Sequence, residues 1–178
     1  HVVEAGEQSK DWRVAQALVD HALDNKLTRQ DLIIALGGGV VGDLAGFVAS
    51  ILHRGVRYIQ VPTTLLAQVD SAVGGKTAIN HPLGKNLVGT FWQPSAVISS
   101  QATLQTLDER EMRSGLAEAV KHGLIMDGEL VDWMVSHDQS ILRRDKAVLG
   151  ALVLRCCALK ASLVQADERD GGQRAALN

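Results

Sequence analysis

Two patterns of hydrophobic and polar positions alternate along the first hundred residues of the chain. Short apolar or β-branched runs fill 32–36 and 56–61, each bounded by glycine or proline, and are typical of buried strands. Between them, residues from 39 onward form a longer apolar segment with helical character. Strands that alternate with helices in this way predict a parallel sheet.

Further elements are predicted on either side of this unit. The opening VVEAG resembles the tail of a strand, and SAVIS at 95–99 resembles a last strand. After the polar stretch GEQSK, Ser9 or Asp11 can cap a helix. One face of that helix is apolar and carries Ala15, Leu18, Val19, Ala22 and Leu23.

The pattern changes after residue 106, where helical spacing continues to residue 166 with only single glycines as interruptions. The charged stretch DERE at 108–111 suits a first helical turn. We therefore expect an α/β domain over 1–107 and the beginning of an α-helical domain over 108–178.

Glycines cluster where the strand at 32–36 meets the following helix. Gly37, Gly39 and Gly42 fit the G-x-G-x-x-G pattern, in which backbone N–H groups and the positive helix end approach a pyrophosphate. Glycines at such a turn also serve close packing alone. No Asp or Glu stands between Asp43 and Asp70, so the acidic residue that usually holds the ribose of a dinucleotide is absent. A standard dehydrogenase is not the best interpretation.

Two lysine-bearing turns, GGKT at 74–77 and GKN at 84–86, follow the second strand. The first is not a P-loop, because the glycine required earlier in that motif would stand at position 70, which is Asp70. Small residues beside these lysines would let a phosphate or sugar oxygens approach the backbone. Ordinary surface lysines in turns are the alternative.

Acidic residues in apolar or helical surroundings are further candidates. Asp70 lies among apolar neighbours and needs a partner if it is buried. Glu118 and Lys121 are one helical turn apart, and Glu118 and His122 share a face at i, i+4. Such a pair can hold a metal, although ordinary helix-surface contacts are more common.

Composition narrows the function classes. A formal net charge of −2, a pI near 6.3 and the lack of a long Lys/Arg run offer no footprint for nucleic acid or an anionic membrane. No apolar run approaches the length of about 18 residues that is needed to span a bilayer. Cys156 and Cys157 are adjacent, which does not suit a disulfide framework. We expect a cytoplasmic protein, and the lack of an initial Met suggests a piece of a longer one.

Five motifs in order resemble the 3-dehydroquinate synthase family: GEQSK, GGGVVGD, HRGVRYIQVPTTLLAQVDSAVGGKTAINHPLGKN, SGLAEAVKHG and ADERDGGQRAALN. The resemblance covers nearly the whole chain and implies the central fragment of a sugar-phosphate cyclase. It implies a Rossmann-like NAD-binding domain followed by the start of a helical metal and substrate domain. The implied reaction of the shikimate pathway converts 3-deoxy-arabino-heptulosonate 7-phosphate to 3-dehydroquinate and phosphate, with NAD and Zn²⁺ or Co²⁺ as cofactors, in a homodimer.

The resemblance also implies roles for individual residues. The positions that match NAD contacts are Glu7, Lys10, Gly38, Gly39, Asp43, Thr63, Thr64, Lys76, Lys85 and Thr106. Those that match contacts to substrate hydroxyl and carboxylate groups are Asp70, Lys121, Lys160 and Asn178. Phosphate contacts match Lys76, Asn86 and Arg174, with Arg54 reaching across the dimer interface.

Glu118 matches the metal-ligand glutamate of the family, whose two histidine partners would lie beyond Asn178. His122 occupies a position that is commonly not a ligand in the family, and Asp170 stands where glutamate is usual. The resemblance leaves three alternatives: another cyclase of the family, a non-catalytic nucleotide-binding module, and an iron-dependent alcohol dehydrogenase. We expect the 178-residue chain by itself to be inactive.

Overall fold

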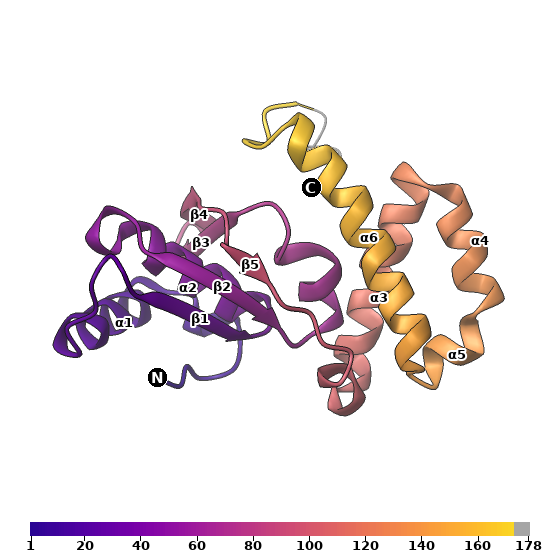
Figure 1. The fold of residues 1–178 in the computed structure, drawn as a ribbon, viewed down its shortest axis with the longest axis horizontal. Coiled ribbons are helices and arrows are strands. Elements are labelled where there is room, and N and C mark those ends of the chain that lie inside the picture. Colours follow the sequence, from indigo (N-terminus) through magenta and orange to yellow (C-terminus); the bar gives the residue numbers. More distant parts are fainter. Residues whose placement is uncertain (173–178) are drawn as a thin grey trace. The chain divides into compact units, whose positions relative to one another are not determined.

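The structure is a computed structural model that describes residues 1–172. Contacts along the chain divide it into two compact units. The first unit combines His1–Pro62 with Gly75–Ile98, and the second combines Thr63–Gly74 with the chain from Ser99 onward. Figure 1 labels the helices and strands of both.

A parallel three-stranded sheet forms the centre of the first unit. Its strands are β1 (Leu32–Gly37), β2 (Arg57–Pro62) and β5 (Ala96–Val97), in the order β1-β2-β5. Both neighbouring pairs are parallel, with Ile34 opposite Ile59 and Ile59 opposite Ala96. The sequence prediction of a parallel sheet is confirmed, because the helix that follows β1 carries the chain back to the start of β2.

Two helices accompany the sheet. Helix α1 (Trp12–Asp24) begins at Asp11, whose side chain accepts a hydrogen bond from the Val14 N–H, as expected for a cap. Helix α2 (Gly39–Ile51) is the crossover helix. The core of this unit joins Ala15 of α1 to Leu44, Phe47 and Val48 of α2. The apolar face predicted for α1 thus packs against α2 through Ala15, Leu18 and Val19, whereas Leu23, which was also assigned to that face, is 47% exposed.

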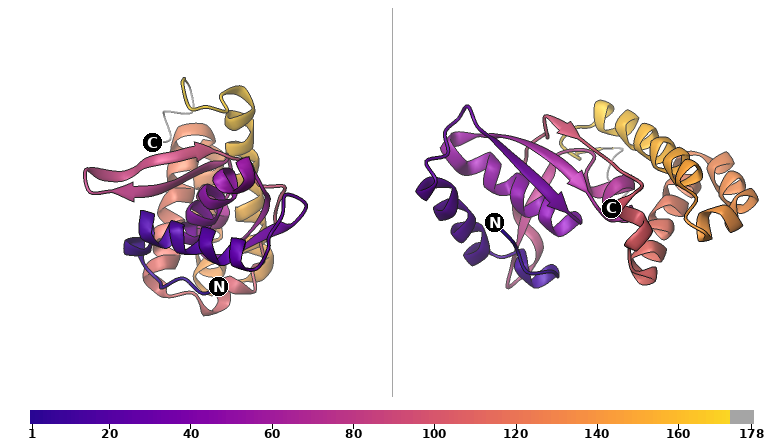
Figure 2. Two further views of the ribbon diagram at one scale, coloured as in Figure 1. Left: turned by 90° about the vertical axis from the view of Figure 1, so that its left-hand side faces the viewer. Right: turned by 60° about the horizontal axis from the view of Figure 1, so that its bottom comes forward.

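The structure differs from the predictions at three places in this unit. The expected lysine turns belong instead to an antiparallel hairpin of β3 (Lys76–His81) and β4 (Gly84–Phe91), visible in Figure 2. Glycines within and beside these strands made them look like turns. The opening VVEAG is not a strand, and the strand expected at 95–99 is only two residues long. Neither segment has the apolar alternation that a longer ladder needs.

Helices form the second unit. They are α3 (Glu109–Met126), α4 (Gly128–Ser136), α5 (Asp138–Leu142) and α6 (Lys146–Ala166). A helical pattern up to residue 166 was predicted, and it is confirmed. The contact-based division differs from the expected boundary at 107/108, because the segment Thr63–Gly74 leaves the sheet and packs among the helices.

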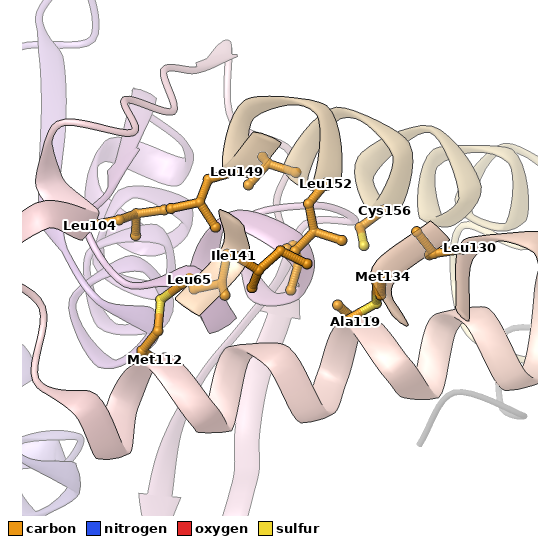
Figure 3. Close-up of a cluster of buried hydrophobic side chains, with 12 residues drawn as sticks. Leu65, Leu104, Met112, Ala119, Leu130, Met134, Ile141, Leu149, Leu152 and Cys156 are labelled. Carbon is orange, nitrogen blue, oxygen red and sulfur yellow. The ribbon is translucent and has the colours of Figure 1, made fainter. Parts of the chain in front are cut away.

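Figure 3 shows the core of the second unit, a cluster of buried apolar side chains from several helices. Leu65 and Val69, from the segment after β2, are fully buried there beside Met112 and Ala119 of α3. Leu149, Leu152 and Cys156 of α6 complete the contact. This packing holds residue 70 among the helices even though it stands far from them in sequence.

Helix α6 has the length and composition of a membrane span, with a mean hydropathy of 1.9 over 18 residues. It also contributes Leu149, Leu152, Val153 and Cys156 to the core and buries Lys160. Core helices of globular proteins commonly share these properties, and a buried lysine tied to a carboxylate is the arrangement expected inside a protein.

Candidate active site

The turn between β1 and α2 presents backbone donors. Gly38 caps α2 without any side-chain hydrogen bond, so the first N–H groups of the helix have no side-chain cap. Such a helix start is suited to an anion such as a pyrophosphate. Gly42 serves packing instead, because a Cβ there would lie 2.6 Å from Oε1 of Gln60 on β2. The packing role is thus observed at Gly42, and the helix start at Gly38 has a geometry that is compatible with an anion.

A buried lysine joins three segments of the first unit. Lys10 is only 3% exposed, and its Nζ donates to Oδ2 of Asp43 at 2.7 Å and to Oδ1 of Asn86 at 2.5 Å. Oε1 of Glu7 lies 3.8 Å from the same Nζ and 3.9 Å from Nζ of the exposed Lys85. The structure thus brings together residues that the resemblance assigned to NAD and one that it assigned to phosphate.

Sequence reasoning missed Asn80, which lies inside this group. Its side-chain Nδ2 donates to Oε1 of Glu7 at 2.8 Å, and its Oδ1 accepts from the backbone N–H of Asn86 at 3.0 Å. Its own backbone N–H donates to the Lys10 carbonyl at 2.7 Å. In the sequence, Asn80 is simply a polar residue that follows Ala78 and Ile79, and this position by itself indicates no functional role.

In the second unit, Asp70 lies on a π-helical turn (Ala67–Ser71) and meets α6. Nζ of Lys160 donates to its Oδ1 at 2.5 Å and to its backbone carbonyl at 2.6 Å. Burial by itself raises the pKa of the Asp70 carboxyl. The His122 imidazole and the Lys160 ammonium lower the pKa by more than burial raises it, so it lies well below its ordinary value. Asp70 therefore stays ionised and holds the lysine.

Helix α3 presents Glu118, Lys121 and His122 near Asp70. Lys121 Nζ lies 2.7 Å from Oε1 of Glu118, and His122 Nε2 lies 3.4 Å from the same oxygen and 3.8 Å from Oδ1 of Asp70. His122 is fully buried, and neither ring nitrogen has a hydrogen-bond partner among the described residues. A buried imidazole that has carboxylates near it but no direct hydrogen bond leaves its ring nitrogens available to a further ligand.

The donors of Asp70, Glu118 and His122 all lie within 4.8 Å of one another. Two carboxylate oxygens and an imidazole nitrogen suit a divalent cation such as Zn²⁺ or Co²⁺. The arrangement therefore fits a metal, and the Glu118 carboxylate, which the resemblance implies is a ligand, is one of its three possible donors. It also places His122, which the resemblance did not support as a ligand, directly beside the Glu118 carboxylate.

The remaining predicted residues stand at other positions of the two units or outside the described residues. Thr63 is half-buried, and Oγ1 of the neighbouring Thr64 accepts a hydrogen bond from the Ala67 N–H. Thr106 is exposed. Lys76 begins β3, and Arg54 is exposed in a left-handed conformation with φ 65°. Gly39 begins α2. Arg174 and Asn178 fall beyond residue 172.

Other features of the structure do not suggest chemistry. Burial raises the pKa of the Cys156 thiol to about 12 and that of Cys157 above its ordinary value, so neither is a ready nucleophile. A cavity of about 830 Å³ in the first unit is lined mainly by apolar side chains of β1, α1 and α2. None of the predicted site residues that the structure describes lines that cavity.

Comparisons with known proteins identify the family of the chain. The family profile "3-dehydroquinate synthase N-terminal" matches residues 1–114, and "3-dehydroquinate synthase C-terminal" matches residues 115–178. The chain is 53% identical over 177 residues to the 3-dehydroquinate synthase of Nitrosospira multiformis, covering 99% of this chain and 48% of that protein. The synthase of Desulforamulus reducens is 54% identical over 176 residues, with coverages of 99% and 49%. The chain thus spans about half the length of these relatives.

Solved structures give the same result. A 2-epi-5-epi-valiolone synthase from Streptomyces hygroscopicus with NAD⁺ and Zn²⁺ bound has a TM-score of 0.93 and 30% identity, covering 99% of this chain and 50% of that one. A 2-deoxy-scyllo-inosose synthase complexed with carbaglucose-6-phosphate, NAD⁺ and Co²⁺ has a TM-score of 0.87 and 28% identity, with coverages of 98% and 47%. An iron-containing alcohol dehydrogenase, at 16% identity and a TM-score of 0.69, shares the fold alone. On the match of both profiles across all 178 residues, the chain belongs to the 3-dehydroquinate synthase family.

Proposed function

We propose that this chain is the central part of an enzyme that converts 3-deoxy-arabino-heptulosonate 7-phosphate to 3-dehydroquinate and phosphate. The observation that carries the proposal is the 52–54% identity to curated 3-dehydroquinate synthases over nearly the whole chain. The buried groups around Lys10 and Asp70 support it, because Lys10, Asp43, Asn86, Asp70 and Lys160 are all positions to which the resemblance assigns ligand contacts.

NAD⁺ would bind to the first unit. The uncapped start of α2 at Gly38 and Gly39 suits the pyrophosphate, and the Glu7 carboxylate beside Lys10 and Asp43 offers an acceptor for ribose hydroxyls. This role for Glu7 accounts for the missing acidic residue in the usual position. Thr63, Thr64, Lys76, Lys85 and Thr106 complete the proposed contacts.

A divalent cation would bind Glu118, together with two histidines of the family that lie beyond residue 178. Support comes from the relatives solved with Zn²⁺ and Co²⁺ and from the buried donors beside Glu118. When bound, NAD⁺ would supply a reversible hydride acceptor and the cation would supply a Lewis acid.

The chain's own residues bind and orient the substrate in this proposal. Lys160, fixed by Asp70, and Lys121, beside Glu118, provide positive charge where substrate oxygens become negative. Lys76, Asn86 and Arg174 would hold the phosphate, and Arg54 would reach it from a partner subunit of a homodimer. Asn178 would contact substrate hydroxyl or carboxylate groups. A cytoplasmic location belongs to the same proposal.

The test uses the full-length enzyme, meaning this chain within a polypeptide of the length of its relatives. We expect one phosphate released per 3-deoxy-arabino-heptulosonate 7-phosphate, with no net NADH. Lys121→Ala should lower kcat by about 10²-fold, since it removes one charged group from the reacting oxygens. Its melting temperature should match that of the exposed-lysine control Lys146→Ala, which keeps full activity.

The likeness to two other cyclases supports a second candidate, a related cyclase that acts on a sugar phosphate without the carboxylate. A heptulose 7-phosphate assayed beside the first substrate separates the two functions. Turnover of the heptulose phosphate alone would replace the first proposal with the second. Stoichiometric NADH release would contradict both, because a cyclase returns its hydride.

A further inference from the structure

Asn80 lies at an irregularity in the β3–β4 hairpin. The ladder pairs Ile79 with Val88 and then His81 with Gly84, so Asn80 has no partner in the strand register. Such bulges turn a side chain away from the direction that a regular strand would give it. Here the side chain of Asn80 reaches both Glu7 and Asn86 instead of a position across the ladder.

The hydrogen bonds of Asn80 connect two segments far apart in sequence. Its Nδ2 donates to Oε1 of Glu7 at 2.8 Å, its Oδ1 accepts from the Asn86 N–H at 3.0 Å, and its backbone N–H donates to the Lys10 carbonyl at 2.7 Å. A single amide therefore joins the turn that carries Glu7 and Lys10 to the strand that carries Asn86. Asparagine is suited to this position, because it has a donor and an acceptor on one short side chain.

The neighbouring contact with Lys10 defines which way the Asn86 amide points. An ammonium group has only donors, so the atom of Asn86 that lies 2.5 Å from Lys10 Nζ must be the oxygen Oδ1. The two N–H donors on Nδ2 are consequently directed away from Lys10. They are the donors that a phosphoryl oxygen requires.

The backbone of Asn86 is held as well. It has a φ of 57°, in the left-handed region that asparagine tolerates better than most residues. The hydrogen bond from its N–H to Oδ1 of Asn80 stabilises that backbone conformation. Asn86 is thereby restrained at its backbone by Asn80 and at its side chain by Lys10.

We propose that Asn80 is a positioning residue that orients Asn86 towards the substrate phosphate and Glu7 towards the cofactor ribose. Asn80 itself touches neither ligand and acts through these two residues. This inference rests on the proposed function, since it takes phosphate and a nucleotide as the ligands of the first unit.

The test compares Asn80→Ala, Asn80→Asp and the control Asn25→Ala in the full-length enzyme. Asn25 is an exposed asparagine of the same unit, and its Nδ2 donates to the His21 carbonyl at the end of α1. For each variant we measure KM for the phosphorylated substrate, kcat, the Kd values for NAD⁺ and inorganic phosphate by calorimetry, and hydrogen exchange at the Asn86 amide.

Asn80→Ala should raise KM and both Kd values about tenfold, leave kcat within about twofold, and remove the exchange protection of the Asn86 N–H. Asn80→Asp keeps the acceptor for that N–H, so protection should persist. It also places a second carboxylate against Glu7, so NAD⁺ should bind about tenfold more weakly. Asn25→Ala should match the wild type in every ligand measurement.

Three outcomes would overturn or redirect the inference. Unchanged ligand affinities in Asn80→Ala, with the wild type active, would show that Asn80 positions nothing. If that variant does not fold, Asn80→Asp decides alone, and an unchanged Kd for NAD⁺ would refute the role. A wild type that binds neither NAD⁺ nor phosphate would refute the proposed function instead.

Discussion

At the scale of single residues, two lysines are buried against oxygen acceptors rather than exposed to water. Lys10 is 3% exposed and Lys160 is 7% exposed, and each donates to a carboxylate, Asp43 or Asp70. Buried ammonium groups are tolerated only when such partners compensate for lost hydration. These lysines are therefore part of the structure as well as candidates for ligand binding.

Asp70→Asn should destabilise the helical unit, because it removes the carboxylate that faces Lys160. Breaking a fully buried ion pair costs about 3–5 kcal/mol. We expect ~2 kcal/mol here, since the Asp70 side chain is 30% exposed and its backbone carbonyl still accepts from Lys160. Urea unfolding followed by circular dichroism measures the change.

Exposed Asp132 of α4 supplies the matched control, and Asp132→Asn should lie within about 0.5 kcal/mol of the wild type. Because the pKa of Asp70 is lowered by folding, its contribution is present above the unfolded value of 3.8 and is lost as the pH falls below it. The difference between Asp70→Asn and the wild type should therefore shrink in acid. Equal free energies of unfolding for Asp70→Asn and the wild type at neutral pH would contradict a stabilising ion pair between Asp70 and Lys160.

At the scale of elements, close contact positions helix α3, which carries Glu118 and Lys121. A Cβ on Gly115 would lie 2.5 Å from Cβ of Leu65 and 2.6 Å from the backbone N of Leu66. Backbone atoms cannot move aside as a flexible side chain can. The segment after β2 and helix α3 therefore pack directly against each other only because residue 115 is glycine.

Gly115→Ala should lower the stability by about 1–3 kcal/mol, as overpacking does, and should also reduce turnover of the full-length enzyme by shifting Glu118. Gly128 at the start of α4 is the control, because a Cβ there would meet nothing within 4 Å. Gly128→Ala should be neutral or more stable by up to about 1 kcal/mol. Equal melting temperatures for the two variants would contradict the close contact.

Prediction of the elements succeeded where periodicity was strong. The strands β1 and β2, the capped helix α1 and the helical character after residue 106 all follow from spacing and caps. The β3–β4 hairpin was missed because Gly75, Gly84 and Gly89 are typical of turns, and only cross-strand pairing reveals the ladder. Tertiary pairing outweighed local propensity there.

At the scale of the whole molecule, the chain crosses between its two units more than once. Segment Thr63–Gly74 belongs to the helical unit although strands of the first unit precede and follow it. A boundary placed by composition cannot show this, because composition changes only once, near residue 108. Because the segment Thr63–Gly74 belongs to the helical unit, Asp70 lies in the same unit as Glu118 and Lys160.

The 178-residue chain by itself should bind Zn²⁺ only weakly and should not turn over substrate. Both carboxylates of the candidate metal group already pair with lysines, and the family's two histidine ligands would lie beyond the chain. Calorimetry with zinc and a phosphate-release assay test this, with the full-length enzyme as the positive control. Sustained phosphate release by the isolated chain would contradict the prediction.

The helical character, the strands β1 and β2, the glycine turn and the family membership could be derived from the sequence, because these depend on local spacing and on motifs in order. Only the tertiary structure decided which side chains meet. Lys160 contacts Asp70 across 90 positions, and Lys10 contacts Asn86 across 76. Separation along a chain does not encode distance in space, so the network around Asn80 and the buried His122 emerge only when packing brings those segments together.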